Sequence, residues 1–324
     1  MSNITNIYFI YIILCNIIEM LKEKYMLNYK IPDDVSLETM EELNRLYWQT
    51  IIIPYIKEAH KIDLHTHTNY SVGKLTIDEL IIKAINGRVK VLAITDYNTI
   101  DGLKEMQKNS MVLDSTIKII NGIELSSITS PISILGYDID VNNKLLNKEL
   151  IKLKDKNINA ILFLIEQFKK NKNVIITYSD IKNIITTEYM MNVICLKRIF
   201  SKYAPISKEE LDSYLEEYHQ EKDYQYFIEL IKNSDGIPVL GKPKLLNLAR
   251  EDFEKLIDEM IYYGLEGIEV YHPSHNKNDI NYYLEIANKY NLLISGGSDF
   301  TGRNVNAKLG LNTNKKLSLL NKLK

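Results

Sequence analysis

The chain is short of cysteine, because its 324 residues include only Cys15 and Cys195. Two cysteines cannot form the disulfide framework of a small secreted protein, and neither stands at a metal-site spacing from another cysteine or a histidine. We therefore interpret both as ordinary apolar residues of a protein from a reducing compartment. On this basis we expect the protein to be cytoplasmic.

An excess of charge of either sign is also lacking, since 40 basic and 42 acidic residues give a formal net charge of −2. Proteins that bind long nucleic acids usually carry a strongly basic surface. The balanced composition therefore favours a small phosphorylated molecule or a short oligonucleotide over a long duplex as the partner.

Long apolar runs are scarce as well. The longest, residues 7–18, is too short to cross a membrane comfortably. No lysine or arginine precedes it and no small-residue cleavage motif follows it, in contrast to a secretory signal. The run is open to three interpretations: a helix packed on the core, sequence upstream of a start at Met20 or Met26, or a weak membrane anchor. We expect no stable membrane insertion.

Among the residues that are present, the pair His65 and His67 is the most informative. Both belong to the segment Asp-Leu-His-Thr-His-Thr at 63–68, which follows apolar, β-branched residues. On a strand, side chains two positions apart point to the same side. Both imidazoles can therefore reach one metal ion, with Asp63 close enough to support them.

Several later segments repeat this pattern, in which a short apolar run leads directly into polar residues. They are residues 91–97, 117–124, 237–243, 267–275 and 292–299. Nearly continuous apolar strands are typical of a parallel sheet that is covered on both faces. Polar residues at the carboxyl ends of such strands are typical of the active sites of α/β barrels. The pattern predicts a barrel-like α/β core with one site at its mouth.

Six segments carry a resemblance to a known family, and they are DLHTHT (63–68), LAITDYNTIDGL (92–103), NGIELS (121–126), ILGYDID (134–140), GLEGIEVYHPSH (264–275) and LLISGGSDF (292–300). In this order they resemble the polymerase and histidinol phosphatase (PHP) superfamily. The likeness is greatest to its subgroup of nucleoside-bisphosphate phosphatases and 5′-to-3′ exonuclease-like proteins. The resemblance implies a distorted (βα)₇ barrel that hydrolyses phosphoesters with up to three metal ions.

The resemblance and the helical patterns together predict how the chain is divided. The expected parts are an N-terminal helical extension at 1–58, a PHP barrel domain at 59–312 and a tail at 313–324. A helical insertion at 142–235 interrupts the barrel, because the motifs stop there and residues 150–170 have apolar side chains at helical spacing. In the resembling subgroup this insertion overhangs the active site, so we expect a lid that contributes to substrate specificity.

The resemblance assigns one metal ion to His65, His67, Glu124 and Asp299, and all four residues are present. The positions that would supply ligands for further ions carry other residues, namely Val72, Tyr97, Asn98, Ser133, Lys242 and Thr301. Two imidazoles and two carboxylates suit Zn²⁺, and also Mn²⁺ or Fe²⁺. We therefore predict a reduced, mononuclear site with one divalent ion per chain.

Further residues within the motifs are candidates for catalysis or substrate binding. We assign catalytic roles to Asp96 and Lys242, with the alternative that Asp96 only orients a neighbour. Lys242 either grips a substrate phosphate as a point charge or is a solvated side chain. Tyr97 and His275 are assigned to substrate binding, whereas His272 is expected to be a loop residue.

Three functions are consistent with these residues. The first is a metal-dependent phosphoesterase that acts on a small phosphorylated substrate, such as a nucleotide, at a mononuclear site. The second is a catalytically impaired relative that serves as a metal- or ligand-binding module. The third is a single-metal hydrolase of a different bond, such as an amide, because single-metal barrels of similar ligation carry out that chemistry and the fold alone does not decide between functions.

Overall fold

The computed structural model describes residues 61–108, 117–127, 130–177, 179–181, 193–218, 223–304, 307–312 and 317–323. The expected extension at 1–58, with its apolar run and Cys15, lies outside the described residues. The side chain of Cys195 also lies outside them. Among the described residues, no helix is both long enough and apolar enough to cross a membrane.

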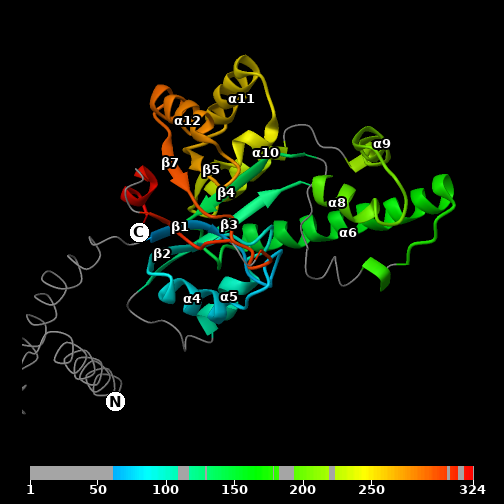
Figure 1. The fold of residues 1–324 in the computed structure, drawn as a ribbon, viewed down its shortest axis with the longest axis horizontal. Helices are drawn as coiled ribbons and strands as arrows, with labels where there is room; N and C mark the ends of the chain where they lie inside the picture. The colour runs from blue at the N-terminus through cyan, green and yellow to red at the C-terminus, as the bar shows by residue number, and fades with distance from the viewer. Residues whose placement is uncertain are drawn as a thin grey trace, which may run out of the picture. The chain divides into compact units, whose positions relative to one another are not determined.

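A curled sheet forms the centre of the described structure (Figure 1). Its strands lie in the order β7-β6-β5-β4-β3-β2-β1-β8. Most neighbours are parallel, as predicted. β4 is an exception because it runs antiparallel to both β3 and β5, and β8 is antiparallel to β1. The strands are β1 Lys61–Thr66, β2 Val89–Ile94, β3 Lys118–Ser126, β4 Ser133–Tyr137, β5 Ile237–Gly241, β6 Gly267–Tyr271, β7 Leu293–Gly296 and β8 Leu311–Asn312.

The segment that follows β7 curls round to the end of β1. Phe300 accepts a hydrogen bond from the His67 amide at 2.9 Å, and its own amide donates to the His65 carbonyl at 3.3 Å. Gly297 lies so close to β1 that a Cβ there would be 2.3 Å from the Cβ of His65, so only glycine fits. The carboxyl ends of β1 and β7 are thereby brought together, and the predicted barrel-like α/β fold is confirmed.

Helices connect the strands and cover the sheet. α4 packs on β2, α10 packs on β4 and β5, and α12 packs on β6. Thr76 begins α4 with the predicted capping box, and Gly87 ends it. The helices are α4 Ile77–Asn86, α5 Asp101–Lys108, α10 Asp223–Lys232, α11 Arg250–Tyr262 and α12 Lys277–Lys289, with short 3₁₀ turns at Glu216–Tyr218, Pro243–Leu246 and Ser318–Asn321.

The predicted helical region between the motifs contains α6 Lys144–Lys172, α8 Val193–Phe200 and α9 Lys208–Tyr214. Leu146 and Leu150, in the first half of α6, belong to the barrel core. The second half of α6 packs with α8 and α9 in a separate core that includes Phe168, Phe200 and Leu211. Figure 1 shows α6 running from the sheet into this second group of helices.

Two boundaries differ from the expectation. α10 lies inside the predicted insertion, but its buried side chains Phe227 and Ile231 belong to the barrel core. The chain near its end was expected to be a tail, yet Leu317 and Leu319 are buried in the same core. Residues 317–323 therefore pack against the barrel through these leucines and do not form a separate tail.

Candidate metal centre

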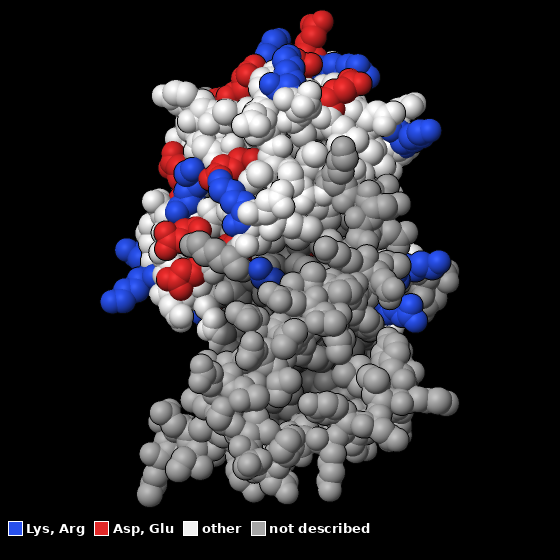
Figure 2. Space-filling view, turned by 90° about the vertical axis from the view of Figure 1, so that its left-hand side faces the viewer, with Lys and Arg blue, Asp and Glu red and all other residues white. Residues whose placement is uncertain are grey.

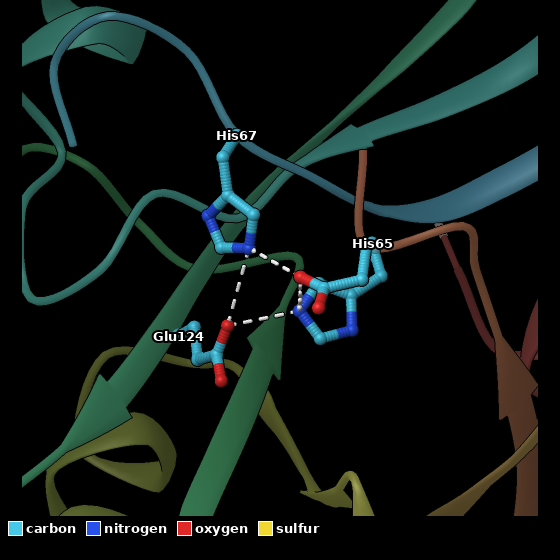
Figure 3. Close-up of side chains that lie close together, drawn as sticks. His65, His67 and Glu124 are labelled. Atoms are coloured by element: carbon cyan, nitrogen blue, oxygen red, sulfur yellow. Dashed lines mark hydrogen bonds and ion pairs between the residues drawn. The ribbon is translucent and has the colours of Figure 1, made fainter. Parts of the chain in front are cut away.

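Four predicted ligands meet where β1, β3 and the segment after β7 converge. His65 lies on β1, His67 follows it, and Glu124 lies on β3. Figure 3 shows the two imidazoles and the Glu124 carboxylate turned toward one another. Asp299 completes a group in which one donor atom from each residue lies within 4.8 Å of the others.

The spacing of these donor atoms fits a tetrahedral metal ion. His65 Nε2 is 2.9 Å from Glu124 Oε2 and 3.6 Å from Asp299 Oδ1. His67 Nε2 is 3.4 Å from Glu124 Oε2 and 3.1 Å from Asp299 Oδ1. Ligand atoms about 2.0–2.1 Å from a tetrahedral ion are roughly 3.3 Å from one another. The chemistry and the spacing of the four residues are therefore both suitable for an ion such as Zn²⁺.

Electrostatic coupling within the group is strong because the side chains of His65, His67 and Glu124 are fully buried. Burial alone would raise the pKa of Glu124, but Lys242 and His65 outweigh it and hold this pKa well below its usual range. Burial alone would lower the pKa of His65, yet the carboxylates of Glu269 and Glu124 raise it to about 10. Without a metal, a proton on the imidazole thus compensates the negative charge that an ion would otherwise neutralise.

Glu269 also belongs to this site, although no role was predicted for it from the sequence. Its Oε1 lies 2.7 Å from His65 Nδ1, and its Oε2 accepts a hydrogen bond from the Lys242 amide at 2.9 Å. A carboxylate on one ring nitrogen of a histidine fixes its tautomer and leaves the other nitrogen free for a metal. The sequence signal was an isolated acid within the apolar strand β6.

Glu269 also belongs to a second possible metal group with His65 and His272. A neutral imidazole has only one nitrogen lone pair available for coordination. His65 can therefore serve one of the two groups, and the first offers four ligands rather than three. Glu269 is better explained as the residue that orients His65.

The second oxygen of Glu124 faces protein groups instead of the histidines. Lys242 Nζ lies 2.9 Å from Glu124 Oε1, and the Ser133 hydroxyl donates a short hydrogen bond to the same atom. Lys242 Nζ also donates to the Tyr97 hydroxyl at 2.5 Å, and the Tyr97 ring stacks on His67 with centroids 4.8 Å apart. Lys242 is only 6% exposed, so its alternative interpretation as a solvated side chain is wrong.

Asp96 lies beside this group but is not one of its members. Its carboxylate accepts hydrogen bonds from the Thr68 amide at 2.7 Å, from the Thr68 hydroxyl at 2.5 Å and from the Ser71 hydroxyl. These bonds hold the turn that follows His67. The contacts favour the orienting role, and a catalytic role for Asp96 stays a prediction.

The pair His272 and His275 lies on the loop between β6 and α12, beside the predicted metal group. His272 is a loop residue, as expected, and its Nε2 also lies 3.4 Å from Asp299 Oδ2. His275 lies behind it, with ring centroids 5.3 Å apart, and its Nδ1 bonds the Val270 carbonyl at 2.9 Å. Burial lowers the pKa of His275. Substrate binding by His275 stays a prediction.

Asp63 anchors the loop that carries Asp299. Its carboxylate accepts bonds from the Ser298 amide at 2.8 Å, the Ser298 hydroxyl at 2.5 Å and the Gly310 amide at 2.7 Å. The backbone next to Asp299 is therefore fixed to β1, the strand that carries His65. Asp63 thus links β1 to the loop that follows β7.

Comparison with known families identifies the family to which the chain belongs. The PHP domain model matches residues 63–294, which is most of the chain. The chain belongs to the PHP family. The resemblance on which the ligand positions were assigned is thereby confirmed.

Two relatives of this PHP protein show what the family does elsewhere. The 5′-3′ exoribonuclease Rnm of Escherichia coli is 24% identical over 247 residues, covering 74% of this chain and 84% of Rnm. The 3′,5′-nucleoside bisphosphate phosphatase of Chromobacterium violaceum is 24% identical over 256 residues, covering 74% of this chain and 86% of the phosphatase.

A solved structure supports the PHP fold independently of the sequence motifs. It belongs to a protein from Bifidobacterium adolescentis that is described as a metal-dependent phosphoesterase. Its TM-score is 0.58 at 21% identity, and the match covers 78% of this chain and 92% of that one. At this identity the likeness shows the fold.

Within this PHP domain, three of the six residues at expected ligand positions lie close together. Tyr97, Ser133 and Lys242 gather on the Oε1 side of Glu124, whereas His65 and His67 face Oε2. Glu124 thus lies between the predicted metal ligands on one side and a set of protein groups that includes one buried cation on the other.

Proposed function

We propose that the protein is a metal-dependent phosphoesterase that hydrolyses a small phosphorylated substrate at a site with a single metal ion. The observation that carries the proposal is the division of Glu124 between the two histidines and Lys242. One oxygen completes a four-residue metal group, and the other is paired with an ammonium. Membership of the PHP family supports hydrolase chemistry.

His65, His67, Glu124 and Asp299 would hold the ion. A divalent metal held by these residues would lower the pKa of a water molecule and polarise a phosphoryl oxygen. Glu269 keeps His65 Nε2 directed at the group, and Asp63 keeps the Asp299 loop in place. The positioning is therefore achieved by residues of the chain before any substrate arrives.

Lys242 is the second positive charge of the proposed site. Two-metal enzymes stabilise the attacking and the leaving oxygens with two cations. Here the Lys242 ammonium lies 2.9 Å from Glu124 and 3.5 Å from Asp299, between the two carboxylates. Opposite charges so close raise the pKa of Lys242 well above its usual value despite burial, so it stays charged. A fixed cation beside the metal would stabilise charge on the substrate phosphate.

Substrate is expected to enter on the side of Asp299. The Asp299 side chain is 30% exposed, whereas His65, His67 and Glu124 are fully buried. A terminal phosphate can reach such an edge more easily than an internal phosphodiester can. The relatives that act on a nucleoside bisphosphate and on RNA support a nucleotide or a short oligonucleotide as the substrate.

The distribution of surface charge agrees with a small substrate. Figure 2 shows basic and acidic side chains interspersed over the described part of one face. Several of these charges are paired, for example Lys289 with Glu254 at 2.5 Å between α12 and α11. Paired charges provide little of the counterion release on which binding of long nucleic acids depends.

The test is metal content combined with phosphatase activity. We expect about one transition metal per wild-type chain and release of phosphate from nucleotides. Glu124→Gln keeps the shape but removes the central negative charge, so it should lose both properties. Glu105→Gln, the same change at an exposed position, should keep both.

The outcomes separate the three functions. Metal without phosphatase activity would favour the metal- or ligand-binding module, and activity on amides alone would favour the hydrolase of another bond. Unchanged metal content in Glu124→Gln would overturn the site assignment itself.

A further inference from the structure

We propose that His272 is a positioning residue that makes Asp299 a one-oxygen ligand and thereby selects a tetrahedral metal such as Zn²⁺ over Mn²⁺. The inference rests on the proposed function, because it concerns the same metal site. It assigns a role to a histidine for which the sequence motifs predicted none.

The two oxygens of Asp299 have different surroundings. Oδ1 faces the metal group, at 3.1 Å from His67 Nε2 and 3.6 Å from His65 Nε2. Among the described residues, Oδ2 faces His272, whose Nε2 lies 3.4 Å away. The environment therefore presents one oxygen to a metal and the other to an imidazole.

The tautomer of His272 follows from its local contacts. The Ser274 amide donates a hydrogen bond to His272 Nδ1 at 3.1 Å, and the Ser274 hydroxyl lies 2.7 Å from the same atom. A ring nitrogen that accepts from an amide carries no proton, so the proton of the neutral ring is on Nε2. His272 therefore cannot coordinate through Nε2, and it presents an N–H to Asp299.

Within the described structure, the Nε2–H of His272 has no other hydrogen-bond acceptor. His272 Nε2 is buried and makes no aligned hydrogen bond, although Asp299 lies within ion-pair distance. A buried N–H without an acceptor is unfavourable. A small rotation of the Asp299 carboxylate, once Oδ1 is drawn to a metal, would give the N–H its acceptor at Oδ2.

Asp299 is the ligand that most needs such control. It follows β7 on a loop, its φ is +48°, and its side chain is the most exposed of the four. A carboxylate with two free oxygens can chelate an ion and raise its coordination number. If Oδ2 is engaged by His272, coordination stays at four protein atoms, the arrangement that Zn²⁺ favours. Mn²⁺ prefers more oxygen ligands and an octahedral arrangement.

The experiment measures dissociation constants for Zn²⁺ and for Mn²⁺ by competition with a coloured chelator, on the full chain. His272→Phe removes the N–H and keeps a ring. We expect its Zn²⁺ affinity to fall about 10- to 100-fold, as on loss of other residues that orient metal ligands. The Mn²⁺ affinity should fall much less, so the preference for Zn²⁺ declines by about tenfold.

Two further variants distinguish positioning from simple packing. His272→Gln retains an N–H donor and should restore most of the Zn²⁺ preference. His275→Phe alters the adjacent buried ring, which bonds Val270 and not Asp299, so it should leave the preference unchanged. His272→Leu provides the same comparison if the phenylalanine variant does not fold, since its side chain is smaller.

Each possible result either supports or overturns the proposed role of His272. A lower Zn²⁺ preference in His272→Phe or His272→Leu, with recovery in His272→Gln, supports the inference. A folded variant without the N–H but with the wild-type preference overturns it, while the proposed function stands. A wild-type protein that binds neither ion overturns the inference and the proposed metal site together.

Discussion

Replacing Lys242 by methionine tests the most unusual feature of the site, a lysine ammonium buried between two carboxylates. The substitution keeps the length and the apolar stem of the side chain but removes the charge next to Glu124 and Asp299. Removing one partner of a buried ion pair typically costs about 3–5 kcal/mol, because the other charge is left uncompensated. We therefore expect metal-free Lys242→Met to be less stable than the wild type by an amount in this range.

Thermal unfolding in the presence of a chelator measures this loss. A difference of about 3–5 kcal/mol corresponds to a fall of roughly 10 °C in the midpoint for a domain of this size. Adding Zn²⁺ should recover part of the loss, since the ion neutralises the same carboxylates. Phosphatase activity of the metal-loaded variant should also fall, because the second cation of the site is missing.

Lys244→Met is the matched control, two residues away. Lys244 pairs with Asp279 at 2.5 Å, but both side chains are partly exposed, at 37% and 22%. Such a pair contributes about 0–1 kcal/mol. If Lys242→Met were as stable as Lys244→Met without metal, the Lys242 ammonium would not be balancing the buried carboxylates, and its assignment as an internal cation would be refuted.

Three further predictions concern the residues around the ligands. Glu269→Gln should weaken Zn²⁺ binding about 10- to 100-fold, because the amide no longer fixes the His65 tautomer; equal affinity in a chelator titration would contradict this. Asp63→Ala should lower the free energy of unfolding by about 1–3 kcal/mol, since the Ser298 and Gly310 amides lose their acceptor; an unchanged urea midpoint would show that the loop does not need this anchor. The pKa of His65 is raised to about 10 in the metal-free protein, so metal must displace a proton at neutral pH, and affinity should rise with pH by up to about tenfold per unit. Calorimetry in buffers of different ionisation enthalpy should record the released proton, and a pH-independent affinity would argue against this coupling.

The proximity of the four predicted metal ligands could be anticipated from the sequence, partly from strand geometry and partly from the family resemblance. The spacing of His65 and His67 places both on one side of β1, and the ends of parallel strands meet at one edge of a sheet. Glu124 and Asp299 were assigned from the family resemblance, and their places near the ends of β3 and β7 agree with that assignment. The antiparallel direction of β4 was not predictable, since a short apolar strand reads the same in either direction.

Other parts of the site depend on which way individual side chains point. Glu269 lies within an apolar strand, and only the approach of His65 from another strand gives it a function. The sequence also could not show which of His272 and His275 faces Asp299, because both follow β6 on one short loop. Burial of Lys242 was similarly hidden, since lysine is usually solvated and its two carboxylate partners come from distant segments.

The path of α6 has a consequence for how this protein can diversify. At 29 residues the helix is about 43 Å long, and it contributes side chains to two hydrophobic cores that share none. The outer core can thus accept substitutions, and even exchange its helices, while the side chains of the barrel core keep their packing. Different helical groups could therefore be joined to the barrel through α6 without repacking the barrel core.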